Sequence, residues 1–191
     1  MIEFLKNIDT QVFLYLNSLH NSFFDIVMWQ ISSIVFWVPF YTILIGFLIY
    51  KYRKQSLYII LSIVLVIIIS DQLSSSIIKP LVERLRPSHD PALEGLVHFI
   101  KDYRGGKYGF VSSHAANTFG LAMFLILFFK NRIFSISLFS WALIVSYSRI
   151  YLGVHYPGDI ICGASIGILA AWLVFVVFTQ RIIKKPLHAG G

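Results

Sequence analysis

The stretch SRIYLGVHYPGD, from Ser148 to Asp159, places an arginine, a histidine and an aspartate between two apolar runs. Pro157 fits the first position of a helix, so Asp159 lies in its first turn and can reach back to His155. A carboxylate bound to one imidazole nitrogen fixes the tautomer and leaves the other nitrogen basic. Such a histidine can act as a nucleophile. The simpler alternative is a helix-capping aspartate beside a solvated histidine.

A second block, KPLVERLRP, runs from Lys79 to Pro87. Lys79 and Arg86 are seven residues apart, about two helical turns, and this spacing predicts that they share a helix face. A lysine point charge and a planar arginine fork together suit a phosphate group. Taken alone, the block is more typical of a lysine that snorkels at a helix end and a solvated arginine.

A third block, GFVSSHAAN, begins at Gly109 and opens an apolar run. Serine at a helix start is a typical cap, and the free N–H groups of a first turn form an anion site. Ser112 therefore caps the helix or holds a phosphate oxygen, and His114 falls in the first turn. By itself this pattern also fits a cap followed by an interfacial histidine. If the three blocks meet, one histidine can attack a bound phosphoryl group while the other protonates the leaving oxygen.

The elements that carry these blocks belong in a membrane. Of the 191 residues, 57% are hydrophobic and only 13% are charged, whereas soluble domains carry roughly 25% charged residues. We therefore expect a single integral membrane domain over residues 1–191. The net charge of +7 lies in short clusters between apolar runs, which indicates bilayer orientation and anionic lipid contact and not nucleic-acid binding. The single cysteine, Cys162, excludes intrachain disulfides and cysteine-based metal cages.

Apolar runs long enough to cross a bilayer recur along the chain: Ile26–Tyr50, Gln55–Ile78, Phe110–Phe129, Ile133–Ser148 and Ile160–Gln180. They predict an all-α, polytopic transmembrane helical bundle of five membrane helices, or six if the N-terminal segment also crosses. Pro39 divides the first run, which is typical of a short interfacial helix followed by a span. Asp71 lies inside the second run and is a functional candidate, because acids inside spans are costly.

Residues 1–20 form a predicted amphipathic helix at the membrane interface, since their apolar residues recur at helical spacing. With five spans, the basic junctions Lys51–Lys54 and Lys130–Arg132 and the tail 181–191 share one side, which the positive-inside rule makes cytoplasmic. The loop of residues 79–110 is then extracytoplasmic. It carries six Lys or Arg residues, against that rule, and anion binding would explain the exception.

These blocks resemble the motifs of the type 2 phosphatidic acid phosphatase superfamily: K-x6-RP, PSGH and SR-x5-H-x3-D. Lys79–Pro87 reproduces the first motif without a gap, and Ser148–Asp159 reproduces the third at the family spacing. Val111–His114 stands where the family has PSGH, with the serine and histidine kept and the proline and glycine replaced. A glycine's backbone freedom is therefore absent at this turn.

The resemblance implies a role for each matching residue. His155 is the nucleophile and forms a phosphohistidine, Asp159 orients it, and His114 is the general acid. The phosphate oxygens are bound by residues of all three blocks: Lys79, Arg86, Ser112, the Ser113 N–H and Arg149. The resemblance implies no metal and no cofactor.

The implied substrate is a lipid phosphate or diphosphate in the bacterial cytoplasmic (inner) membrane. Undecaprenyl diphosphate, lipid A phosphate, phosphatidylglycerol phosphate and phosphatidic acid are the family's bacterial substrates, and a site facing the periplasm favours the first two. Undecaprenyl diphosphate is the expectation here, as the more general need. Two alternatives remain: a binding-only relative, which the altered second block favours, and an anion transporter, which would need polar residues through the midplane. The vanadium haloperoxidases share the motifs but are soluble, unlike this chain.

Overall fold

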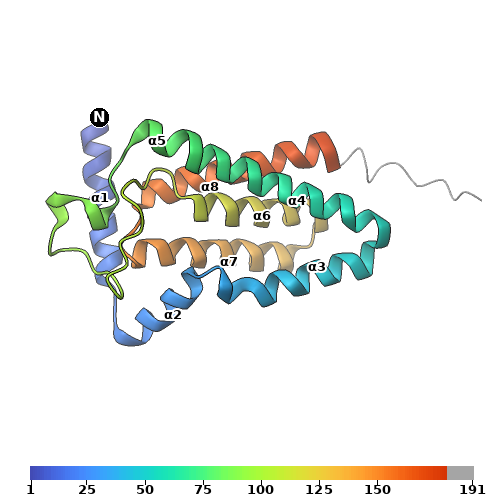
Figure 1. Ribbon diagram of the computed structural model, residues 1–191, viewed down its shortest axis with the longest axis horizontal. Coiled ribbons are helices and arrows are strands. Elements are labelled where there is room, and N and C mark those ends of the chain that lie inside the picture. Colours follow the sequence, from blue (N-terminus) through green and yellow to red (C-terminus); the bar gives the residue numbers. More distant parts are fainter. Residues whose placement is uncertain (180–191) are drawn as a thin grey trace, which may run out of the picture.

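The computed structural model describes residues 1–179, so the predicted tail at 181–191 lies outside the described residues. The described chain is helical throughout its regular elements (Figure 1). The α-helices are α1 (Ile2–Ser18), α2 (Ser22–Ser32), α3 (Val38–Tyr52), α4 (Ser56–Asp71), α5 (Lys79–Val82), α6 (Ser113–Phe129), α7 (Arg132–Tyr151) and α8 (Pro157–Val174). A π-helical segment, Gln72–Ile78, joins α4 to α5, and another, Phe175–Thr179, extends α8.

Three helical segments are long and apolar enough to cross a membrane: Val35–Val82, Arg132–Tyr151 and Pro157–Phe178. The first turns back on itself at Arg53, whose φ is +49°, so that α3 and α4 lie side by side in opposite directions (Figure 1). Helix α6 is apolar and slightly shorter, at 17 residues. The predicted all-α, multi-pass bundle of α3, α4, α6, α7 and α8 is therefore confirmed.

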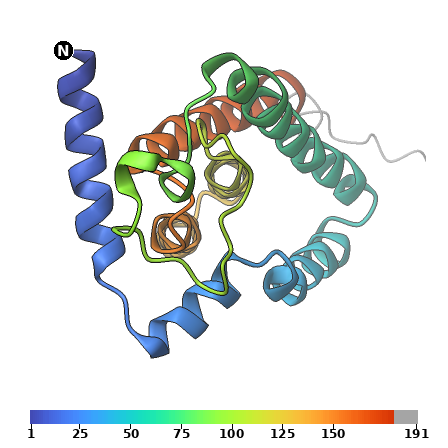
Figure 2. The ribbon, with the colours of Figure 1, turned by 60° about the vertical axis from the view of Figure 1, so that its left-hand side comes forward.

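The first predicted run, residues 26–50, is broken as Pro39 indicated. Helix α2 ends at Ser32, and α3 begins at Val38 with Pro39 in its first turn. A proline is tolerated there because the first N–H groups of a helix have no intrahelical partner. The break lets α2 turn away and cover the end of the bundle next to α7 (Figure 2).

Helix α6 is the centre of the bundle and packs against α4, α7 and α8. Its contact with α8 is close because α8 presents Gly163 and Gly167. A Cβ atom at Gly167 would collide with the carbonyl oxygen of Ala116, and one at Gly163 with that of Ser112. Small residues at this spacing let membrane helices approach backbone to backbone. The approach joins the two helix starts, since the Ser112 N–H donates to the backbone oxygen of Asp159 over 3.0 Å.

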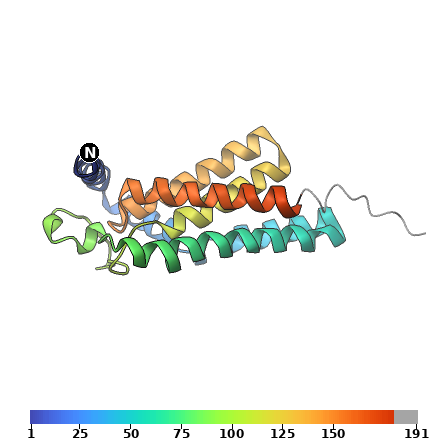
Figure 3. The same ribbon diagram turned by 90° about the horizontal axis from the view of Figure 1, so that it is seen from above.

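Helix α1 does not join the bundle but lies across one end of it (Figures 2 and 3). Phe4, Leu5, Ile8 and Val12, on its predicted apolar face, are exposed. The opposite side faces the protein. There Phe13 is fully buried, with its ring centroid 5.3 Å from that of Tyr156. An exposed apolar stripe on a helix lying across the bundle end supports the interfacial position that the sequence predicts.

The two ends of the bundle differ in chemistry. The basic junctions of the α3–α4 and α6–α7 turns lie at one end, and α1, α2 and the long segment between α5 and α6 lie at the other (Figure 1).

The long segment between α5 and α6 is partly extended. The Arg86 N–H donates to the Lys107 oxygen over 3.1 Å, and the Gly109 N–H donates to the Arg84 oxygen over 2.8 Å.

Candidate active site

His155 and Asp159 form the buried dyad that their spacing predicts. Pro157 starts α8, which places Asp159 in the first turn. His155 is 1% exposed and Asp159 is 0% exposed. The imidazole Nδ1 lies 3.4 Å from Asp159 Oδ2, and the Tyr156 N–H donates to the same oxygen over 3.0 Å. The backbone of the helix start thus holds the carboxylate against the imidazole.

The second ring nitrogen of His155, Nε2, lies 3.4 Å from Nη1 of Arg86. A guanidinium can only donate, so Nε2 presents its lone pair, and the ring proton sits on Nδ1, facing Asp159. Burial, reinforced by the positive charges of Arg86, Arg149 and Lys79, holds the pKa of His155 well below its usual value. The imidazole is therefore neutral, with its free lone pair directed at a cation and at whatever anion that cation binds.

Arg86 reaches the site by a different route from the one its spacing predicts. The expectation that Lys79 and Arg86 share a helix face is wrong, because the helix ends at Val82 and Glu83 adopts a left-handed conformation with φ +49°. Arg86 precedes Pro87, which disfavours helical backbone, and it is extended, with ψ 154°. Its Nε donates to the Tyr108 oxygen over 3.1 Å. Lys79, at the start of α5, is half-buried, and its charge interacts with those of Arg86, Arg149 and Asp159.

Arg149 is buried at the end of α7. Its Nη1 donates to the Ser32 hydroxyl of α2, and its Nη2 donates to the Tyr103 hydroxyl over 3.2 Å. Its Nε is buried without a hydrogen-bond partner among the residues that the structure describes. A buried guanidinium N–H in this condition is available to an anion.

The start of α6 completes the cluster. Ser112 is the N-cap, and its hydroxyl accepts from the Ala115 N–H over 3.4 Å. The Ser113 hydroxyl is 2.7 Å from that of Ser75, and the Ser113 N–H lies in the first turn of α6. His114 lies close enough to Arg149, His155, Arg86 and Lys79 for their charges to interact. The eight residues predicted for the site therefore lie at the same end of the bundle.

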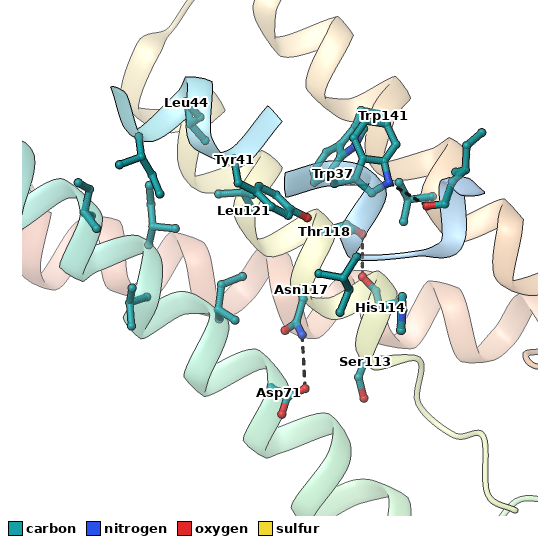
Figure 4. A pocket seen from close by; sticks show the side chains of 18 of the residues that line it. Trp37, Tyr41, Leu44, Asp71, Ser113, His114, Asn117, Thr118, Leu121 and Trp141 are labelled. Atoms are coloured by element: carbon teal, nitrogen blue, oxygen red, sulfur yellow. Dashed lines mark hydrogen bonds between the residues drawn. The ribbon is translucent and has the colours of Figure 1, made fainter. Parts of the chain in front are cut away.

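An apolar cavity of about 470 Å³ runs from this cluster into the bundle (Figure 4). Its walls come from α2, α3, α4, α6 and α7: Ile31, Ser32, Ile34, Trp37, Tyr41, Leu44, Ile45, Leu48, Ile60, Ile63, Val64, Ile67, Asp71, Ser113, His114, Asn117, Thr118, Leu121, Trp141 and Val145. Along α4 it extends from Ile60 to Asp71, roughly 16 Å of helix. His114 also borders a smaller cavity of about 270 Å³ that contains Arg149 and Tyr103. The histidine therefore lines both the apolar cavity and the space beside Arg149.

Asp71, the acid predicted as a functional candidate, sits on the wall of the apolar cavity. Its Oδ1 accepts from the Asn117 amide over 3.4 Å (Figure 4). The same oxygen accepts from the Ser75 hydroxyl, also over 3.4 Å. Through Ser75 it is linked to Ser113 at the start of α6. This polar group gives the cavity a hydrogen-bonding rim next to His114.

Arg84, which the sequence analysis did not select, contacts the dyad directly, and Asp9 is linked to the dyad through Arg84. Arg84 Nη1 is 3.0 Å from Asp159 Oδ1, and its Nη2 is 2.8 Å from Oδ2 of Asp9 in α1. Arg84 lies inside the KPLVERLRP block, two residues before Arg86. This position in a motif block is the sequence feature that could have marked it as a site residue. Asp9 has no local signal, because 150 positions separate it from Asp159.

Comparison with known proteins gives the family to which the chain belongs. The PAP2 superfamily model matches residues 56–183. Lipid A 4'-phosphatases of Bacteroides thetaiotaomicron and Porphyromonas gingivalis are 44% and 38% identical to this chain, over 93% of its length and 80% and 75% of theirs. The crystal structure of a transmembrane PAP2-type phosphatidylglycerolphosphate phosphatase from Bacillus subtilis superposes with a TM-score of 0.72 at 22% identity, covering 95% of this chain and 89% of that one. This chain belongs to the PAP2 superfamily and is a multi-pass membrane phosphatase.

Proposed function

We propose that the chain removes phosphate from a membrane lipid through a phosphohistidine formed on Nε2 of His155. The observation that carries the proposal is the meeting of two environments at His114. On one side is the cluster of Lys79, Arg86 and Arg149, which suits a phosphoryl group. On the other is the apolar cavity, which suits a hydrocarbon chain.

The chemistry follows from the groups around the phosphate. The negative charge of the bound phosphate favours the protonated form of His114. The Nε2 lone pair of His155 attacks phosphorus, the bond from phosphorus to the lipid oxygen breaks, and His114 gives its proton to that oxygen. Asp159 holds the Nδ1 proton and stabilises the charge that develops on the ring. Water, deprotonated by His114, then attacks phosphorus. The phosphorus–nitrogen bond breaks, and inorganic phosphate leaves the cation cluster.

Lipid A phosphate is the substrate that we favour. The two relatives described above are named lipid A 4'-phosphatases, and this moves the preference away from undecaprenyl diphosphate, which the sequence analysis placed first. Undecaprenyl diphosphate, phosphatidylglycerol phosphate and phosphatidic acid remain the comparison substrates. The cavity accommodates part of one chain of any of these lipids, so headgroup contacts decide among them.

We also propose that the site faces the periplasm from the inner membrane. The basic turns at Lys51–Lys54 and Lys130–Arg132 lie at the bundle end opposite the site, and the positive-inside rule favours a cytoplasmic position for them. The cationic residues at the site end then serve phosphate binding. The exposed apolar face of α1 is suited to lie in the outer leaflet at the level of the headgroups.

The first experiment measures phosphate release in detergent, with EDTA present, from the four lipids and from a water-soluble phosphate monoester. We expect release from lipid A above the other lipids, and slow release from the soluble ester, which leaves the apolar cavity empty. We expect His155→Ala to abolish release, because the nucleophile is lost. The reaction needs no metal, since the cations are side chains, so EDTA leaves the rate unchanged.

Three outcomes would contradict parts of the proposal. Loss of activity in EDTA would call for a metal. Full activity of the His155→Ala protein would remove the phosphohistidine. Absence of release from every lipid by folded protein would favour the binding-only alternative, and the Val111–His114 turn would then be the first place to examine.

A further inference from the structure

We infer that Arg84 and Asp9 are positioning residues for the nucleophile: together they fix the Asp159 carboxylate that holds His155. The inference rests on the proposed function and extends it to α1, which contributes no side chain to the cation cluster. Both residues act through Asp159 and do not touch the phosphate. Helix α1 thereby helps to position the nucleophile, although it does not contact the phosphate.

The Arg84 guanidinium has a partner at each terminal nitrogen and on one face of its plane. One nitrogen pairs with Asp159 Oδ1 at 3.0 Å and the other with Asp9 Oδ2 at 2.8 Å. The plane lies over the Tyr156 ring, 3.9 Å from its centroid. Both terminal nitrogens of Arg84 are therefore occupied by carboxylates and not by a phosphate site. Its position separates it from Arg86, whose Nη1 faces His155.

The two Asp159 oxygens divide their partners. Oδ1 accepts from Arg84, while Oδ2 accepts from the Tyr156 N–H and lies against His155 Nδ1. A carboxylate fixed at both oxygens cannot rotate away from the imidazole. Because Asp159 is fully buried, removal of its cation leaves a buried charge without its ion pair, which is strongly unfavourable. Arg84 therefore sustains the ionised, correctly turned carboxylate that fixes the His155 tautomer.

Asp9 in turn fixes Arg84. The Gly158 N–H in the first turn of α8 donates to Asp9 Oδ1 over 2.7 Å, which suits a carboxylate at a helix start. A Cβ atom at Gly158 would stand 2.8 Å from Asp9 Oδ2, so a side chain there would displace the Asp9 carboxylate.

Helix α1 is itself anchored beside this contact. Phe13 packs on Tyr156, and the Asn17 amide donates to the carbonyl oxygens of Ile150 and Tyr151 over 3.1 and 2.9 Å. Asp9, Phe13 and Asn17 are spaced by four residues and share the inward side of α1. Direct contacts therefore link Asp9 of α1 to Arg84, and Arg84 to the carboxylate of Asp159.

The test uses Arg84→Gln, Arg84→Lys and Asp9→Asn in the full chain. Glu3→Gln is the matched control for Asp9→Asn, because it removes the same charge from an exposed position of the same helix. Arg132→Gln, exposed at the opposite end of the bundle, is the control for Arg84→Gln. We expect kcat to fall roughly 10- to 100-fold in Arg84→Gln and less in Asp9→Asn, as for other partners that orient a functional ligand. Arg84→Lys should recover part of the loss, since it keeps the charge without the fork.

Competitive inhibition by inorganic phosphate separates positioning from phosphate binding. We expect the inhibition constant and KM to change less than about threefold in Arg84→Gln, because the phosphate ligands remain in place. Arg86→Gln, measured beside it, should weaken phosphate inhibition. In the double variant Arg84→Gln/Asp9→Asn, the losses should not add, because both residues act through one carboxylate.

Two results would overturn the inference: unchanged kcat in folded Arg84→Gln, or a parallel loss of kcat and phosphate inhibition, which would make Arg84 a phosphate ligand. If Arg84→Gln does not fold, Asp9→Asn decides by the same two criteria against Glu3→Gln. The wild-type protein assayed in the same series keeps the two proposals distinct. Its failure to release phosphate would refute the proposed function, whereas an active wild type with unaffected variants would refute only the positioning role.

Discussion

At the scale of single residues, the site depends on a histidine that stays neutral. His155 is surrounded by Arg86, Arg149 and Lys79, it contacts Asp159, and it has a backbone hydrogen bond with Gly109. Burial and the three cations lower its pKa, and these effects outweigh the hydrogen bond with Gly109, which raises it. In the folded state the ring therefore binds fewer protons than in the unfolded chain. Its contribution to stability is present above its ordinary pKa of about 6.5 and is lost as pH falls below that value.

The lowered pKa of His155 also predicts how kcat/KM should change with pH on the acid side. In the wild type, protonation of His155 should contribute no loss of kcat/KM near pH 6.5, because the imidazole remains unprotonated there. In Arg86→Gln one cation facing the imidazole is gone, so the pKa of His155 rises and the acid limb should move to higher pH. The measurement is kcat/KM against pH for both proteins on one substrate, whose own ionisation is then common to both. Coincident acid limbs would contradict this account.

At the scale of elements, α3 is set apart from the packed centre. It packs beside α4 but not closely against α6, and the apolar cavity occupies the space between them (Figure 4). By contrast, α6 and α8 are drawn together by Gly163 and Gly167. The close contact between α6 and α8 therefore brings the residues of the site together. On the proposed function, the cavity beside α3 leaves room for a lipid chain of the substrate.

Filling the cavity from α3 should impair lipid turnover selectively. Leu44 lines the cavity and is 9% exposed, and Leu44→Trp should lower kcat/KM for the lipid by about 10-fold or more, because a displaced chain misplaces the phosphate. The slow reaction with a soluble phosphate monoester should be unchanged. Leu61→Trp, at a position of α4 that is 54% exposed, is the matched control. Equal losses on both substrates would indicate a distorted site and not a filled cavity.

At the scale of the whole molecule, the bundle separates its two ends. The site, α1 and the segment between α5 and α6 occupy one end, and the basic turns occupy the other (Figure 3). On the proposed function, a cavity that opens from the cation cluster toward the bundle interior would let a lipid keep its chain at membrane depth while its phosphate occupies the cluster. The polarity of the charges thus fits a lipid substrate drawn from one leaflet.

The orientation can be measured with a membrane-impermeant maleimide on spheroplasts of a Cys162→Ser protein. Leu96→Cys, in the site-end segment and 62% exposed in the native residue, should be labelled from outside. Lys54→Cys, in the turn between α3 and α4, should be labelled only after the membrane is permeabilised. The reverse pattern would place the site in the cytoplasm and overturn the proposed periplasmic location.

The sequence by itself determined the class of the protein, its spans and the residues of its three blocks. Apolar runs of membrane length predict helices, because in lipid the backbone N–H and C=O groups of each segment must form hydrogen bonds within that segment. The pairing of His155 with Asp159 was also predictable, since both lie within a single helix start. These features are local, so a linear pattern records them.

Only the tertiary structure decided how the blocks meet. Arg86 reaches His155 through an extended segment and not along a helix face, because Glu83 and Pro87 end helical geometry between them. The contribution of Asp9 depends on α1 folding across the bundle end, 149 positions from its partner Gly158. The cavity exists because α3 stands away from α6. Such features depend on packing between distant segments, and helical periodicity in one segment carries no information about its distant neighbours.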